Sequence, residues 1–255
     1  MDASNGSVPR LVAASTCLIS VVVCLHGQSP PAFDAVSVKP SPLDTIERSL
    51  THNAGGRLTT SNGTVRMLIL LAYQVMPYQV SGGPAWINTD GYDIEAKAAN
   101  PNSTPEQFRK MVQTLLADRF QLKVHTETRE MAIYALEIAK GGPKLRPSAS
   151  DEQNPGVRNG RGETTGVRAT MAMLATALTR PLQREVVDET GLKGEYSFTV
   201  KFDPVETSMP DTPPELSGAG SIFTALQEQL GLHLKVTRGP VRILIIDTAA
   251  RPSAN

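Results

Sequence analysis

One pattern, an amphipathic helix followed by two alternating strands, occurs four times along this chain of 255 residues. Its clearest copy begins at Thr104, where Thr104 and Gln107 are spaced to cap each other's backbone N–H groups. Apolar residues follow at spacings of three and four as far as Phe120, which predicts a helix with one core-facing side. The segments expected after this helix are a strand at 122–125, a turn at 128–130 and a second strand at 132–139. The unit is therefore interpreted as a helix followed by a β-hairpin.

The other three copies keep the same order of helix, strand and strand. Their expected elements lie at 65–75, 78–81 and 92–98, at 171–179, 184–187 and 196–202, and at 222–230, 232–237 and 241–247. The first and third copies align with a shift of 104 residues, which superposes Tyr92 on Tyr196, and the second and fourth copies also correspond. The sequence thus predicts an internally duplicated α+β fold. Its helix-hairpin (αββ) units are expected to form mixed sheets with helices packed on them.

The duplication divides the chain into two expected halves, 29–148 and 161–255. A linker rich in Pro, Ser, Gly and Asn joins them at 149–160. Halves of this length are expected to share one hydrophobic core. The last strand, 241–246, is apolar on both faces and is expected near the middle of a sheet, so a chain that ends at Gly239 should not fold.

The N-terminal segment has the layout of a secretory signal. Arg10 precedes an apolar run from Leu11 to Leu25, which predicts a signal peptide over residues 1–28. The run is shorter than the roughly 20 residues that a membrane-spanning helix needs, so we expect no membrane span after cleavage. An uncleaved N-terminal anchor is the alternative. In either case the body of the protein is expected outside the cytoplasm, in the periplasm or the exterior.

Composition narrows the possible partners. Both cysteines, Cys17 and Cys24, lie in the apolar run, so the processed protein is expected to contain neither disulfides nor a thiolate nucleophile. Twenty-five basic residues balance twenty-five acidic ones, so no nucleic-acid partner is expected.

The residues that carry chemistry in other proteins do not form a motif here. The spacing of the histidines lacks the pattern of a zinc peptidase, and no Gly-x-Ser-x-Gly run is present, so we predict no catalytic residue, metal or cofactor. His125 lies on the polar face of its strand, and Trp86 follows the glycines at 82–83 in a loop where an indole can stack on a sugar or a peptide. Trp86 and His125 are thus the candidate ligand-binding residues. A surface histidine and a tryptophan folded onto the core are the alternatives, and Asp247 is interpreted as a carboxylate that caps a turn.

Several segments together resemble a known family. They are FDAVSVKP at 33–40, GGPAW at 82–86, LLADRFQLKVH at 115–125, DETGLKGEY at 188–196 and the ending at 230–255. In order and spacing they are similar to the soil-associated family of exported bacterial proteins of unknown function, which occurs as many paralogues in soil bacteria. The resemblance implies an envelope or secreted location and supplies no catalytic residue. Similar domains attached to membrane-bound antirepressor-type peptidases imply a role in sensing.

These observations favour a non-enzymatic binding, sensing or interaction module of the cell envelope. Its partner is expected to be an unknown envelope protein or a small ligand. The alternative is an envelope hydrolase whose site is assembled from distant residues, for instance His125 with a carboxylate from another unit, because such a site needs no local motif.

Overall fold

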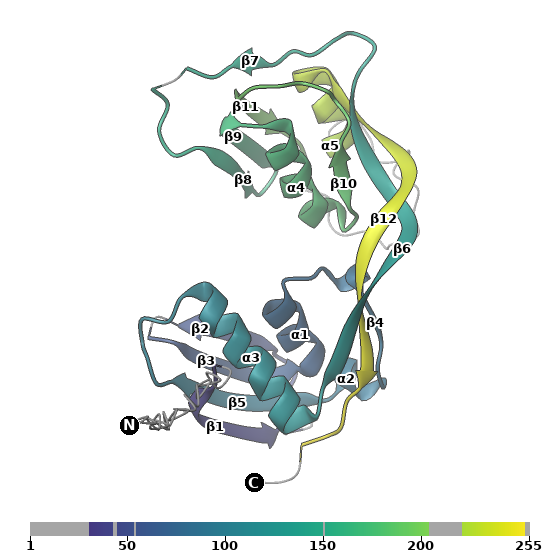
Figure 1. The fold of residues 1–255 in the computed structure, drawn as a ribbon. Coiled ribbons are helices and arrows are strands. Elements are labelled where there is room, and N and C mark those ends of the chain that lie inside the picture. Colours follow the sequence, from purple (N-terminus) through teal and green to yellow (C-terminus); the bar gives the residue numbers. More distant parts are fainter. Residues whose placement is uncertain (1–30, 43–44, 54, 150, 204–220, 253–255) are drawn as a thin grey trace, which may run out of the picture. The chain divides into compact units, whose positions relative to one another are not determined.

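The computed structural model describes residues 31–42, 45–53, 55–149, 151–203 and 221–252, so the expected signal peptide lies outside the described residues. Three four-stranded sheets and the helices packed on them make a mixed α+β fold (Figure 1). The predicted fold class is therefore confirmed at this level.

Sheet A is antiparallel and carries two helices on one face (Figure 1). Its strand order is β1 (Phe33–Pro40), β5 (Gly91–Ala98), β3 (Arg57–Thr64) and β2 (Ser49–Asn53). The helices are α1 (Val65–Tyr73) and α3 (Pro105–Phe120). The Thr104 hydroxyl accepts a hydrogen bond from Gln107 N, and the Gln107 side chain accepts one from Thr104 N, so the predicted start of α3 is confirmed.

Sheet C has strands in a corresponding order. That order is β7 (Arg146–Pro147), β11 (Tyr196–Lys201), β9 (Glu163–Ala169) and β8 (Gly156–Gly160). Its helices are α4 (Met171–Leu182) and α5 (Ile222–Ala225), and a π-helical turn, Leu226–Leu230, continues α5. Strand β8 lies within the segment that the sequence assigns to a linker.

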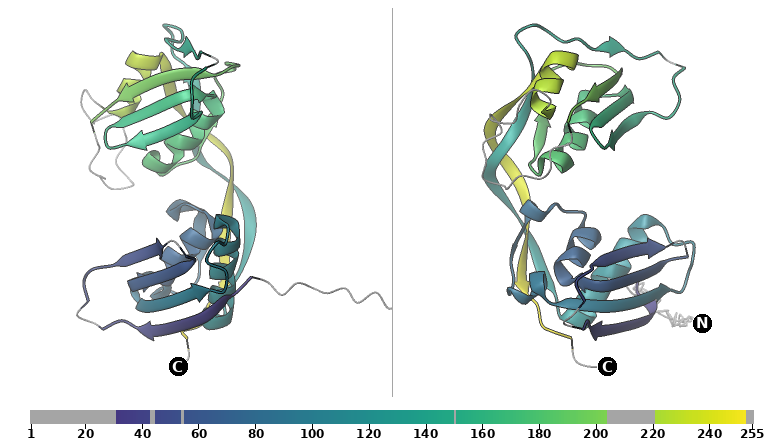
Figure 2. Two further views of the ribbon diagram at one scale, coloured as in Figure 1. Left: turned by 90° about the vertical axis from the view of Figure 1, so that its left-hand side faces the viewer. Right: turned by 180° about the vertical axis from the view of Figure 1, so that it is seen from behind.

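Sheet B contains two long strands that pair antiparallel over almost their whole length (Figures 1 and 2). They are β6 (Lys123–Ile138) and β12 (Leu232–Thr248). Two short parallel strands flank them: β10 (Val186–Asp188) on β6 and β4 (Val80–Gly82) on β12. A 3-10 turn, Pro77–Gln79, and the short helix α2 (Trp86–Thr89) lie on either side of β4.

The expected hairpins of the αββ units are wrong. The segments 122–125 and 132–139 belong to one continuous strand, β6, and the segments 232–237 and 241–247 belong to one strand, β12. The remaining expected hairpins separate as well, since β4 and β10 join sheet B while β5 and β11 join sheets A and C. The polar run that suggested a turn at 128–130 is a stretch of β6 exposed on both faces. Pro240 is tolerated within β12 because β12 has a described partner on one side only at this position. That partner is β6, while β4 pairs with β12 further along, at 244–246.

Buried apolar side chains form two large clusters and a small one. The cluster on sheet A also contains Leu244 and Ile246 of β12, and the cluster on sheet C also contains Tyr134 and Leu136 of β6. The small cluster surrounds Ile133, Val241 and Ile243 on the opposite face of sheet B. Both sequence halves therefore contribute to each large cluster.

Candidate functional site

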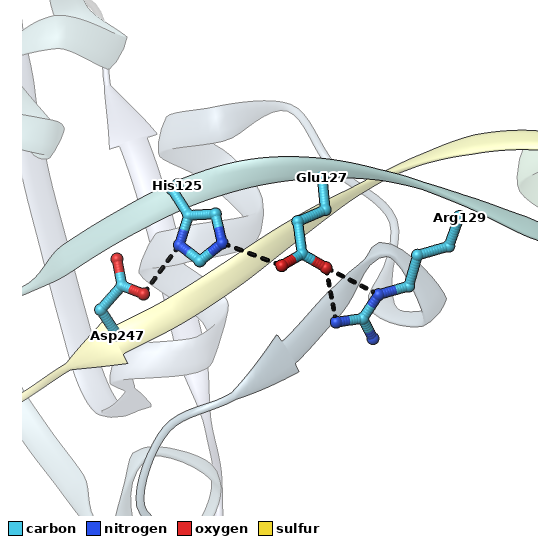
Figure 3. A network of polar contacts seen from close by, with 4 residues as sticks. All are labelled: His125, Glu127, Arg129 and Asp247. Carbon is cyan, nitrogen blue, oxygen red and sulfur yellow. Dashed lines mark hydrogen bonds and ion pairs between the residues drawn. The ribbon is translucent and has the colours of Figure 1, made fainter.

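Four charged side chains lie together at one end of sheet B (Figure 3). His125, Glu127 and Arg129 occupy alternate positions of β6, so their side chains project from the same face. The register pairs His125 with Ile245 of β12, which places Asp247 diagonally opposite the imidazole. We call these four residues the His125 cluster.

The imidazole contacts a carboxylate on each side. Its Nδ1 lies 2.7 Å from Asp247 Oδ1, and its Nε2 lies 3.1 Å from Glu127 Oε1 (Figure 3). The second oxygen of Glu127 accepts hydrogen bonds from Arg129 Nε at 2.9 Å and from Arg129 Nη2 at 2.7 Å. The cluster is thus a chain of alternating charges that joins two strands 122 residues apart in the sequence.

These contacts favour the charged forms of His125 and Glu127. Hydrogen bonds to Glu127 and then Asp247 raise the pKa of His125 above its usual value. Hydrogen bonds from His125 and Arg129 lower the pKa of Glu127. An imidazolium donates from both nitrogens, and this geometry supplies one carboxylate acceptor for each of them.

This arrangement suits a charged clamp better than a general base. A catalytic histidine needs one nitrogen free to accept a proton from a nucleophile or from water. Here both nitrogens face carboxylates, and the side chain is 48% exposed rather than enclosed. His125 is exposed at the surface, and Asp247, expected to cap a turn, instead pairs with His125.

Trp86 packs onto the core of sheet A. Its ring stacks on Phe120 with a centroid distance of 6.5 Å and meets Tyr92 edge to face at 6.5 Å. The Arg251 guanidinium lies 5.3 Å from the Trp86 ring centroid, while Arg251 Nε is 2.9 Å from Asp90 Oδ2. The indole therefore has protein groups against it where a stacked ligand would lie, and Trp86 and His125 do not contact each other through any described interaction.

The other two described histidines serve local contacts. The ring of His52 stacks on Phe108 with a centroid distance of 3.7 Å, and His233 Nε2 lies 3.4 Å from Glu137 Oε2. His233 borders a shallow depression beside Phe223 and Gln227. Among the described residues no group of three or more His, Cys, Asp and Glu side chains is placed to hold a metal ion.

Two features were not predicted from the sequence. Arg129 completes the His125 cluster, and its signal was the alternation of charges along 125, 127 and 129. A second shallow depression lies between β8 and α4, lined by Val157, Ala172, Met173, Thr176 and Ala177. Its signal was Met173, an apolar residue on the side of the predicted helix that faces away from the core.

Fold and site together define a mixed α+β protein whose principal charged cluster is open to solvent. A family model described as "protein of unknown function (DUF3738)" matches residues 66–249, and the chain belongs to this family. Searches among curated proteins and among solved structures found no match for the chain. Within the described residues, the helices are all too short or too polar to cross a membrane.

Proposed function

We propose that this protein is a non-enzymatic binding or interaction module of the cell envelope. The observation that carries the proposal is the pairing of both His125 nitrogens with carboxylates on an exposed strand face. That pairing holds the one histidine of the cluster in a structural role. The partner, an envelope protein or a small ligand, then binds to a preformed surface of the fold.

An export assay tests the cellular location. Residues 1–30 are fused to alkaline phosphatase, which needs disulfides and is active only outside the reducing cytoplasm. We expect activity from this fusion in a bacterial host, and none when Val21→Lys and Val22→Lys interrupt the apolar run. N-terminal sequencing of the exported product should place the cleavage near residue 28. Absence of phosphatase activity from the fusion, or activity that the two lysines leave unaffected, would contradict the location.

The alternative function is an envelope hydrolase, and one observation favours it. Asp247 orients the His125 ring at 2.7 Å, as a carboxylate orients the base of many hydrolases. The two functions are separated by incubating residues 29–255 with peptides, esters and cell-wall fragments while recording both product formation and melting temperature. We expect a saturable rise in melting temperature without turnover. Turnover that His125→Ala and Asp247→Asn both abolish would establish the hydrolase instead.

We also infer that the fold arose by internal duplication. Sheets A and C have corresponding strand orders, and the hydroxyls of Thr64 and Thr170 cap α1 and α4 in the same way. Asn62 and Arg168 both adopt positive φ two residues before those caps, at 50° and 43°. These matches support a common origin for the two halves, each of which lends a short strand to the long strand of the other. We also propose that this family is the soil-associated one, whose members occur as many paralogues.

A further inference from the structure

Strand β8 is an open edge of sheet C. Within the part of the chain that the structure describes, β8 pairs only with β9, and Figure 1 shows it at the border of the sheet. The opposite edge is protected, because β7 is two residues long and ends in Pro147. Strand β8, with the sequence Gly-Val-Arg-Asn-Gly, has neither a proline nor a lysine to deter another strand.

The two faces of β8 differ in chemistry. Val157 lines the shallow depression against α4, and Asn159 Nδ2 donates a hydrogen bond of 2.8 Å to Ala177 O of the same helix. Side chains alternate along a strand, so Arg158 projects from the opposite face of sheet C. A strand added beside β8 would alternate in the same way, with one set of side chains next to the depression and the other next to Arg158.

The depression is apolar and partly open. Met173 is 38% exposed although it is a large hydrophobic residue, and its neighbours Ala172 and Ala177 are too small to cover it. At β2, the edge strand in the corresponding position of sheet A, the ring of His52 stacks on Phe108 of the covering helix. The depression beside Met173 can therefore accept an apolar side chain of a partner strand, and we call this position the seat.

The surroundings of β8 are positively charged. Strand β8, the turn after it and α4 contain Arg158, Arg161 and Arg180 and no acidic residue. All three arginines are exposed, and none forms an ion pair with another described residue. This charge complements an acidic partner, and like charges would repel a basic one.

We infer that β8 is a docking edge for an extended acidic segment of a partner protein, in which apolar and acidic residues alternate. The segment pairs with β8 through backbone hydrogen bonds, places an apolar side chain against Met173 and sets its carboxylates beside Arg158. This inference rests on the proposed binding function and names its site and the class of its partner.

The test uses residues 29–255 and the fluorescent peptide Glu-Val-Glu-Leu-Glu-Val-Glu, with binding measured by anisotropy. We expect saturable binding that Arg158→Glu and Met173→Glu each weaken about tenfold, since one reverses the charge and the other fills the seat with a carboxylate. Arg57→Glu, at an exposed position of sheet A, is the matched control and should bind as the wild type does. The peptide Lys-Val-Lys-Leu-Lys-Val-Lys should not bind. Melting curves show which variants remain folded.

Backbone methylation distinguishes strand addition from simple charge attraction. Only one edge of the added peptide faces β8, so N-methyl groups on alternate residues should abolish binding in one of the two possible series and spare it in the other. Binding by both series, or equal binding by the Arg158→Glu and wild-type proteins, would overturn the docking edge. Binding of the peptide elsewhere would leave the proposed binding function standing, while cleavage of the peptide would refute that function. Loss of binding because copies of the chain pair through β8, seen as a dimer in solution, would also overturn the inference.

Discussion

At the scale of single residues, His125 makes the stability of the protein depend on pH. Hydrogen bonds to Glu127 and Asp247 raise its pKa in the folded state, so its contribution is fully present below the unfolded value of about 6.5 and is lost as the pH rises through the folded value. We therefore expect the difference in unfolding free energy between the wild type and His125→Ala to be larger at pH 5.5 than at pH 9. Urea unfolding at both values measures it, and a difference independent of pH would contradict the charged clamp. Because the cluster is exposed, added salt should reduce the effect.

The site was predictable at this scale only in part. Alternation along the strand placed His125 on a polar face beside Glu127, because side-chain direction follows from local geometry. The contact with Asp247 depends on the register of two strands 122 residues apart, which no local pattern specifies. The same limit applies to Trp86, whose packing on Phe120 and Arg251 requires three distant segments.

A second prediction concerns Gly231, which ends the π-helical turn in a left-handed conformation with φ 67°. A Cβ atom at this position would clash with Gly142 O, so Gly231→Ala forces the backbone apart in addition to straining φ. Gly191 has nearly the same φ, 66°, and its Cβ would meet nothing within 4 Å. We expect Gly191→Ala to cost about 1 kcal/mol from conformation alone and Gly231→Ala to cost clearly more. Equal losses in urea unfolding would show that the close approach is unimportant.

At the scale of elements, helices follow from the sequence more readily than strand partners do. The capping signals of α3 are local, and they placed its start correctly, while the apolar spacing placed its last residue at Phe120. The hairpin interpretation was wrong for two reasons. Strand β6 pairs with β12, which is far away in the sequence, and the polar middle of β6 resembles a turn. Two alternating segments separated by polar residues are compatible with a hairpin and with one long exposed strand.

The cap of α3 gives a direct test at this scale. Thr104→Ala removes the hydroxyl that accepts from Gln107 N at 3.2 Å, while Thr104→Ser keeps it. We expect the alanine variant to lose about 1 kcal/mol of unfolding free energy and the serine variant to stay close to the wild type. Thermal or urea unfolding of both proteins checks this. If the two variants lose the same amount, the loss comes from the methyl group rather than from the cap.

At the scale of the whole molecule, the last strand connects regions that the sequence order separates. The section of β12 after Gly239 supplies Leu244 and Ile246 to the core of sheet A, and Val241 and Ile243 to the small cluster on the other face. The same section pairs with β4 and with the beginning of β6. Residues close to the C-terminus therefore complete a core whose other members lie mostly in the first half of the chain.

Removing that section should unfold the protein. The truncation removes four buried aliphatic side chains, and the lost burial costs roughly 6–12 kcal/mol at about 1.5–3 kcal/mol each. This loss is comparable with the whole stability of a typical domain, about 5–15 kcal/mol. We expect residues 29–239 to show no cooperative thermal transition, whereas residues 29–252, which keep β12 and Arg251, should melt as the longer chain does. Circular dichroism and size-exclusion chromatography follow both. A soluble 29–239 chain that melts cooperatively would mean that the core of sheet A is complete without β12.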